Sequence, residues 1–72
     1  MVNTEMLNAR IDGSGYKRAY IASELNITRQ SFCSKVNNST EFLSSEVQNL
    51  CRVLGIESLD EKEAIFFADT VD

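Results

Sequence analysis

The chain has 72 residues, of which 43% are hydrophobic, and a formal net charge of −4. A chain of this length forms one small domain, and its apolar content excludes a disordered polypeptide. It contains no proline and no histidine. The lack of proline favours an all-α fold, and two cysteines without histidine exclude a four-ligand zinc site. We therefore expect a single domain over residues 1–72, with no metal and no other cofactor.

Two further classes of protein are disfavoured. No apolar run approaches the roughly 18 residues that a membrane span needs. Residues 1–10, MVNTEMLNAR, lack the basic and apolar segments of a secretory signal. We expect a cytoplasmic protein that does not bind a membrane. Its cysteines, Cys33 and Cys51, are expected to be reduced thiols, with a disulfide or a redox role as the alternative.

The charged residues are distributed unevenly along the chain. Residues 1–40 carry five basic and three acidic side chains, whereas residues 41–72 carry two basic and eight acidic ones. The local field, rather than the net charge, decides what a surface attracts. The N-terminal part can therefore present a basic face on an acidic protein.

The first helix is predicted over about residues 4–12, with Asn3 or Thr4 as its N-cap. Leu7 and Ile11 are four residues apart and fall on one face. The sequence Gly-Ser-Gly at residues 13–15 is expected to end the helix in a turn.

The second helix is predicted over about residues 17–25, with Ile21 and Leu25 on one face. Asn26 follows, and asparagine tolerates the left-handed conformation better than most residues.

The third helix is predicted to begin after Thr28, a good N-cap, and to run to about residue 37. Phe32 and Val36 are four residues apart and face inward. A polar loop is expected over residues 37–40.

The fourth helix is predicted over about residues 45–54. Residues 45–48 fit a capping box that begins at Ser45, although Ser44 could equally be the cap. Gly55 is expected to end this helix.

The fifth helix is predicted over about residues 59–70, where residues 58–61 form a second capping box. Phe66 and Phe67 are adjacent and point about 100° apart on a helix. Either both rings are covered within a monomer, or the pair contributes to a homodimer interface, because an exposed aromatic patch marks an interaction site.

Residues of about 17–37 meet the requirements of a helix-turn-helix, two helices joined by a tight turn. Ala22 is a small residue where two helices cross closely. Asn26 follows four residues later in the turn, and Ile27 and Phe32 are apolar residues that fix the crossing. The outward face of the second helix of this motif is polar and partly basic.

The segment YKRAYIASELNITRQSFCSKVNN resembles the Cro/C1-type helix-turn-helix repressors of phages, the XRE family. The downstream segments EFLSSEVQNLCRVLGI and EKEAIFFAD are similar to small phage-encoded repressor-like proteins. The resemblance covers roughly residues 5–69. The chain departs from the family pattern at Asn26, which replaces the usual glycine. It departs again at Lys35 and Val36, where the usual inward residue comes three positions after Phe32.

The resemblance implies a compact five-helix lambda-repressor-like domain whose third helix enters the DNA major groove. Arg29 would read guanine and Gln30 adenine, and Ser34, one turn beyond Gln30, would reach a base. The residues implied to contact phosphate, and so to set the register of the protein on DNA, are Lys17, Arg18, Ser31, Lys35, Asn38 and Ser39.

The leading hypothesis is therefore a sequence-specific transcriptional regulator, a phage or prophage Cro/C1-like repressor that binds double-stranded operator DNA. The alternative is a helix-turn-helix fold used for protein–protein interaction, as in an antirepressor or an antitoxin. An enzyme is disfavoured, because no histidine or glycine-rich phosphate loop is present and neither cysteine has a general base beside it. No small-molecule ligand is inferred.

Overall fold

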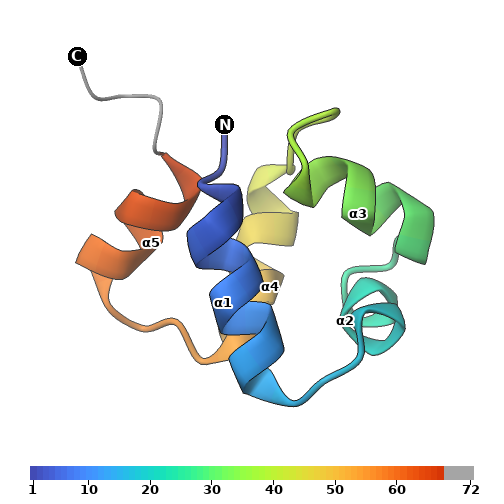
Figure 1. Ribbon diagram of the computed structural model, residues 1–72, viewed down its shortest axis with the longest axis horizontal. Coiled ribbons are helices and arrows are strands. Elements are labelled where there is room, and N and C mark those ends of the chain that lie inside the picture. The colour runs from blue at the N-terminus through green and yellow to red at the C-terminus, as the bar shows by residue number, and fades with distance from the viewer. Residues whose placement is uncertain (68–72) are drawn as a thin grey trace.

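The computed structural model describes residues 1–67, and within this range all regular secondary structure is α-helical. The helices are α1 (Thr4–Ser14), α2 (Arg18–Glu24), α3 (Arg29–Val36), α4 (Ser44–Leu54) and α5 (Leu59–Phe66) (Figure 1). The predictions of an all-α fold and of five helical segments are confirmed. None of the helices over residues 1–67 has the length and apolarity needed to cross a membrane.

The first helix is longer than its sequence pattern predicted. The side chain of Asn3 accepts a hydrogen bond from the backbone N–H of Met6 at 3.1 Å, so Asn3 is the N-cap. Gly13 lies inside the helix, and only Gly15 adopts a left-handed φ, of 80°. The prediction that α1 ends at residue 12 was wrong, because one glycine within a helix costs only about 1 kcal/mol and does not end it.

The junction between α2 and α3 agrees with its prediction in detail. Asn26 has a φ of 61°, the left-handed conformation expected of it. The backbone N–H of Ile27 donates to the carbonyl of Ala22 at 3.1 Å, which closes the end of α2. Thr28 caps α3, since its hydroxyl accepts from the N–H of Ser31 at 3.0 Å. The chain therefore turns between the two helices over only residues 25–28.

The start of α4 differs from both predicted caps. Leu43 is the N-cap residue, and Ser44 and Ser45 are the first helical residues. Leucine has no side-chain acceptor, so only one half of a capping box forms, in which Glu46 Oε1 accepts from the N–H of Leu43 at 2.9 Å. At the other end Gly55 has a φ of 73° and terminates α4 as predicted.

The last helix begins as predicted, with the Ser58 hydroxyl accepting from the N–H of Glu61 at 3.3 Å. It ends at Phe66, and Phe67 is its C-cap residue. The prediction that it extends to residue 70 concerns positions that lie outside the described residues.

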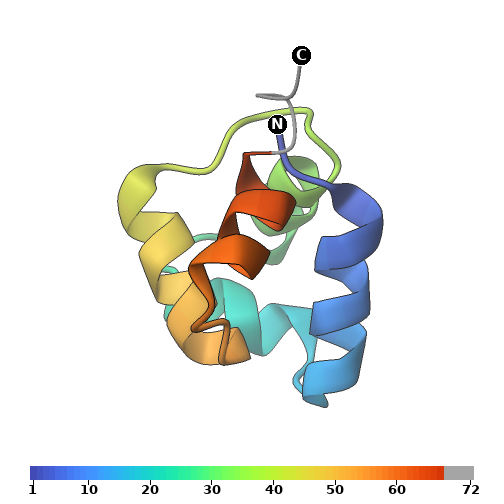
Figure 2. The same ribbon diagram turned by 90° about the vertical axis from the view of Figure 1, so that its left-hand side faces the viewer.

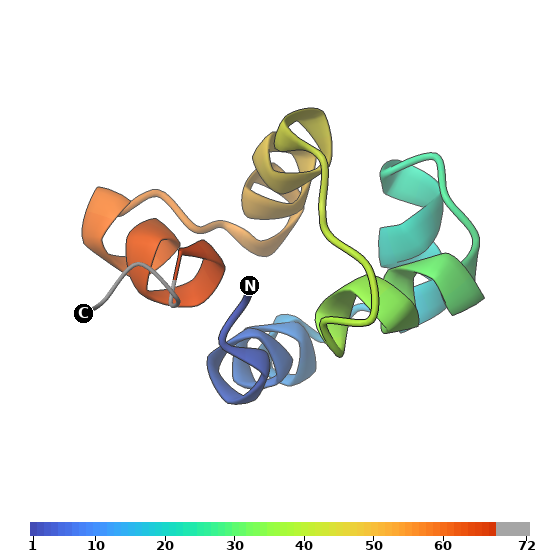
Figure 3. The same ribbon diagram turned by 90° about the horizontal axis from the view of Figure 1, so that it is seen from above.

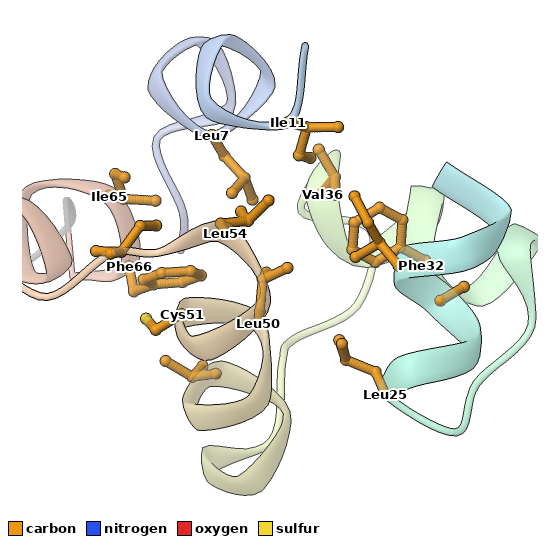
Figure 4. Packing of buried hydrophobic residues seen from close by; sticks show 14 residues of the cluster. Leu7, Ile11, Leu25, Phe32, Val36, Leu50, Cys51, Leu54, Ile65 and Phe66 are labelled. Atoms are coloured by element: carbon orange, nitrogen blue, oxygen red, sulfur yellow. The ribbon is translucent and has the colours of Figure 1, made fainter. Parts of the chain in front are cut away.

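One hydrophobic core joins the five helices (Figure 4). Its buried residues are Leu7, Ile11, Ile21, Ala22, Leu25, Phe32, Val36, Val47, Leu50, Cys51, Leu54, Ile56, Ile65 and Phe66. The half-buried ring of Phe42 bridges two parts of this core. It packs edge-on against Phe32 at 6.2 Å and against Phe66 at 6.0 Å between ring centroids.

The helices are arranged so that α2 and α3 form one end of the molecule and α5 the other. Helices α1 and α4 lie between these ends, as Figures 1 and 3 both show. From the α5 side, α5 lies in front of the space between α1 and α4 (Figure 2). The acidic turn of α5 at Asp60 and Glu61 therefore lies far from the exposed side of α3.

Candidate nucleic-acid interface

The exposed side of α3 carries a stripe of polar residues. Successive residues of a helix turn by about 100°, so Gln30, Ser31 and Ser34 project opposite the inward pair Phe32 and Val36. Gln30 is exposed, and the two serines are half-buried. The stripe offers one amide and two hydroxyls, which can each donate and accept hydrogen bonds.

Two arginines lie at the starts of neighbouring helices and line one groove. Arg18 is the first residue of α2, and Arg29 is the first residue of α3. The groove has a volume of about 320 Å³ and is lined by Asn8, Arg18, Arg29, Cys33, Val36 and Asn37. Two arginines that line one hollow between α1, α2 and α3 form a donor set suited to an anion such as a phosphate.

The charge of Arg18 is partly compensated within the chain. Its Nη2 atom lies 3.4 Å from Asp12 Oδ1, and the Asp12 side chain is 75% exposed. An ion pair this exposed is worth little and can exchange for another anion. The pairing of Arg18 with Asp12 was not predicted from the sequence. The turn at Gly15 brings Asp12 to α2, and no local sequence pattern indicates that approach. Lys17, the residue before α2, is exposed as expected.

Lys35 differs from the expectation of an outward, phosphate-contacting side chain. Its Nζ atom lies 3.1 Å from Glu46 Oε1 and donates to the carbonyl of Glu41 at 2.9 Å. Only 12% of its side chain is exposed. The reason is its position directly before the inward Val36, which places Lys35 on the flank of α3 that faces α4. The covered carboxylate of Glu46 requires a cation there.

The loop after α3 is partly held by hydrogen bonds within the chain. The side chain of Asn38, predicted to contact phosphate, is hydrogen-bonded to the N-terminal segment at Val2 and Thr4. Ser39 is exposed, and its backbone N–H donates to the carbonyl of Ser34 at 2.9 Å. Both residues are exposed, and it is the Asn38 side chain that is engaged in hydrogen bonds within the chain.

The two adjacent phenylalanines occupy different environments. Phe66 is 5% exposed and belongs to the core, so its ring cannot form a contact outside the monomer without unpacking. Phe67 is 46% exposed. It borders a groove of about 470 Å³ between the N-terminus, the loop before α4, and α5. The predicted dimer contact, if it forms, is limited to Phe67 of this pair.

Two further ion pairs among the described residues lie away from the polar stripe of α3. Arg10 Nε pairs with Glu61 Oε2 at 3.2 Å, and Arg10 Nη2 donates to the carbonyl of Leu54 at 2.9 Å. Arg52 of α4 pairs with Glu24 of α2 at 3.8 Å.

The described part of the chain contains no group of three or more acidic, cysteine or histidine side chains that could hold a metal ion. Both cysteines are free, with Cys33 half-buried and Cys51 buried. Burial raises the pKa of the Cys51 thiol above its ordinary value, although the nearby Lys62 ammonium opposes the rise. Cys51 is therefore a neutral core residue at physiological pH.

Comparison with protein-family models, with curated proteins and with solved structures gave no match.

Proposed function

We propose that this protein is a sequence-specific DNA-binding transcriptional regulator of the Cro/C1 kind, acting in the cytoplasm. In this proposal α2 and α3 form a helix-turn-helix, and α3 lies in the major groove of operator DNA. The observation that carries the proposal is the placement of Arg18 and Arg29 in one groove, beside the exposed Gln30. Phosphate-binding and base-reading donors are thus adjacent at one end of the molecule.

The roles of the side chains follow from their reach. Arg29, in the first turn of α3, suits the O6 and N7 atoms of guanine, and Gln30 suits the N6 and N7 atoms of adenine. Ser34 lies one turn further along the same stripe. Arg18, Lys17, Ser31 and Ser39 are left to contact phosphates, which set register rather than sequence preference.

The distribution of acidic residues is consistent with this orientation. Helix α5 lies at the opposite end from α2 and α3 (Figure 3), so its carboxylates are distant from the proposed DNA. They also limit non-specific affinity, because phosphates repel them. A homodimer of this chain would read a palindrome with half-sites about 34 Å apart.

The test is selection of bound duplexes from a random pool at low salt, followed by titration of the selected sequence. Arg29→Ala should weaken binding at one base position by about 1–3 kcal/mol. Arg52→Ala removes the same charge from α4 and should leave the sequence preference unchanged. If the pool yields no enriched sequence and no duplex is bound, the proposal is wrong.

A second candidate is a protein-binding module, which the exposed apolar side chains favour. Leu43, Leu59 and Phe67 are 62%, 67% and 46% exposed, respectively, in a chain of net charge −4. Such residues suit a partner protein better than a polyanion. A tight complex with a protein partner, together with failure to bind any duplex, would favour this candidate.

A further inference from the structure

The last turn of α3 is connected to α4 by an ion pair that the proposed DNA contacts do not use. Lys35 Nζ lies 3.1 Å from Glu46 Oε1, and the two side chains are only 12% and 9% exposed. The same ammonium group donates to the carbonyl of Glu41 at 2.9 Å. A pair covered to this degree is part of the packing between helices rather than a solvated surface charge.

The carboxylate of this pair also holds the loop that joins the two helices. Glu46 Oε1 accepts a hydrogen bond from the backbone N–H of Leu43 at 2.9 Å. A single oxygen atom therefore links the end of α3, the end of the loop and the first turn of α4. Figure 3 shows this loop running from the end of α3 to the start of α4.

The position of Lys35 around α3 determines what the ion pair controls. Phe32 and Val36 are one turn apart, and their directions differ by about 40°. These two apolar contacts lie almost on one line along α3, so they alone leave this short helix free to rotate about that line. Lys35 projects about 100° from Val36, toward α4, and a contact there opposes rolling. Rolling would redirect the polar stripe of Gln30 and Ser34.

Stability alone does not explain why this contact is ionic. Replacement of a buried ion pair by apolar residues of similar volume is often neutral or stabilising. An ion pair differs in what its loss costs, because a rotated helix would leave a covered charge without its partner. The pair therefore disfavours every setting of α3 except the one in which Lys35 meets Glu46.

We propose that Lys35 and Glu46 are positioning residues that fix the rotation of α3, and so decide which of its side chains meet the base edges. This inference rests on the proposed function, because it assigns a consequence for DNA reading. It also has a consequence in the free protein, namely the rigidity of α3. Neither residue contacts DNA in this arrangement.

The first experiment compares Lys35→Met with Lys17→Met, which removes the same charge from the exposed start of α2. Affinity is measured for the preferred duplex and for a scrambled one over a range of salt. Lys35→Met should lower the ratio of the two affinities about tenfold without changing the salt slope. Lys17→Met should weaken both equally and lower the slope by about 1. If Lys35→Met behaves like Lys17→Met, Lys35 is a phosphate contact and the inference is wrong.

The second experiment guards against misfolding and against failure of the proposed function. The double variant Lys35→Met/Glu46→Leu replaces the whole pair by apolar side chains, and it should fold. Backbone amide exchange should become faster in the last turn of α3 and in residues 37–43, but not in α1. A wild-type protein without any sequence preference defeats the proposed function, whereas unchanged exchange in the double variant defeats the positioning role. Full sequence preference in the double variant also defeats it.

Discussion

The side chain of Asn38 forms a two-way hydrogen-bonded pair with the backbone of Val2. The N–H of Val2 donates to Asn38 Oδ1 at 2.8 Å, and Asn38 Nδ2 donates to the carbonyl of Val2 at 3.0 Å. The Thr4 hydroxyl adds a bond of 2.8 Å to the carbonyl of Val36. The N-terminal segment is thereby fixed to the end of α3, so α3 is held at its C-terminal end by Val2, which precedes α1, and by Thr4, the first residue of α1.

Asn38→Asp tests this connection, because aspartate is isosteric and also tolerates the left-handed φ of 66° found there. It keeps the acceptor but loses the donor of the 3.0 Å bond to the Val2 carbonyl and of the longer 3.4 Å bond to the Thr4 hydroxyl. We expect the free energy of unfolding to fall by about 1 kcal/mol, the net worth of one such bond. Chemical denaturation measures it. Ser39→Asp introduces the same charge at the exposed neighbour and should change the stability by less. Equal effects of the two variants would mean that charge, not the hydrogen bond, is responsible.

A second prediction about stability concerns the turn between α2 and α3, where one substitution should be neutral and another destabilising. Asn26 has a φ of 61°, a conformation that glycine adopts without strain. Asn26→Gly should therefore leave the free energy of unfolding nearly unchanged, whereas Asn26→Ala should lower it by about 1 kcal/mol. Thermal and chemical unfolding of both variants measure the difference. A stable Asn26→Ala variant would show that the turn can relax to a negative φ.

The turn residue and the N-cap between α2 and α3 show which parts of the structure the local sequence could predict. Asn26 and Thr28 act through atoms within a few residues of themselves, and both were predicted correctly. The inward setting of Phe32 and Val36 follows from helical spacing alone. The all-α class and most helix ends at a cap or a glycine were therefore predictable without a structure, and the exceptions were the helical Gly13 and the start of α4.

The contacts of the side chains at the proposed interface were harder to predict from the sequence. Their hydrogen-bond and ion-pair partners lie far away along the chain. A lysine at the boundary of an apolar stripe is normally solvated, and nothing near Lys35 indicates a covered carboxylate at Glu46. Asn38 likewise meets Val2 across 36 positions. The predicted start of α4 was wrong for a different, local reason: Glu46 caps the helix through the backbone N–H of Leu43, three residues earlier, and not through a serine side chain.

The two thiols should differ in reactivity and in how they make the stability of the protein depend on pH. Cys51 is buried, and burial raises its pKa above the ordinary value, whereas Cys33 is half-buried. A thiol-specific reagent should modify Cys33 first, and Cys51 only upon unfolding.

The pKa of Cys51 is higher in the folded chain than in the unfolded chain. The contribution of this thiol to the free energy of unfolding is therefore constant at neutral pH. It decreases as the pH rises above the ordinary thiol pKa of 9.0, where only the unfolded chain ionises. Cys51→Ala should lower the stability overall but reduce that alkaline loss. An unchanged alkaline loss would contradict this assignment.

The pairing of Arg18 with Asp12 predicts a variant that binds DNA more tightly, provided that α2 and α3 form the proposed interface. The exposed carboxylate competes with phosphate for the guanidinium group, at 3.4 Å. Asp12→Asn should raise the affinity for all duplexes several-fold at low salt, with a smaller gain at high salt because screening weakens both interactions. Its stability should change by less than about 1 kcal/mol, as for other exposed pairs.

Asp60→Asn makes the same change of charge in α5, at the far end of the molecule, and is the matched control for Asp12→Asn. At ionic strengths near 0.1 M, charges separated by more than about 10 Å are largely screened, so Asp60→Asn should have little effect on affinity. A gain common to both variants would indicate that net charge alone governs binding. A gain confined to Asp12→Asn would locate the phosphate contact at Arg18, because only there does the substitution release a basic side chain.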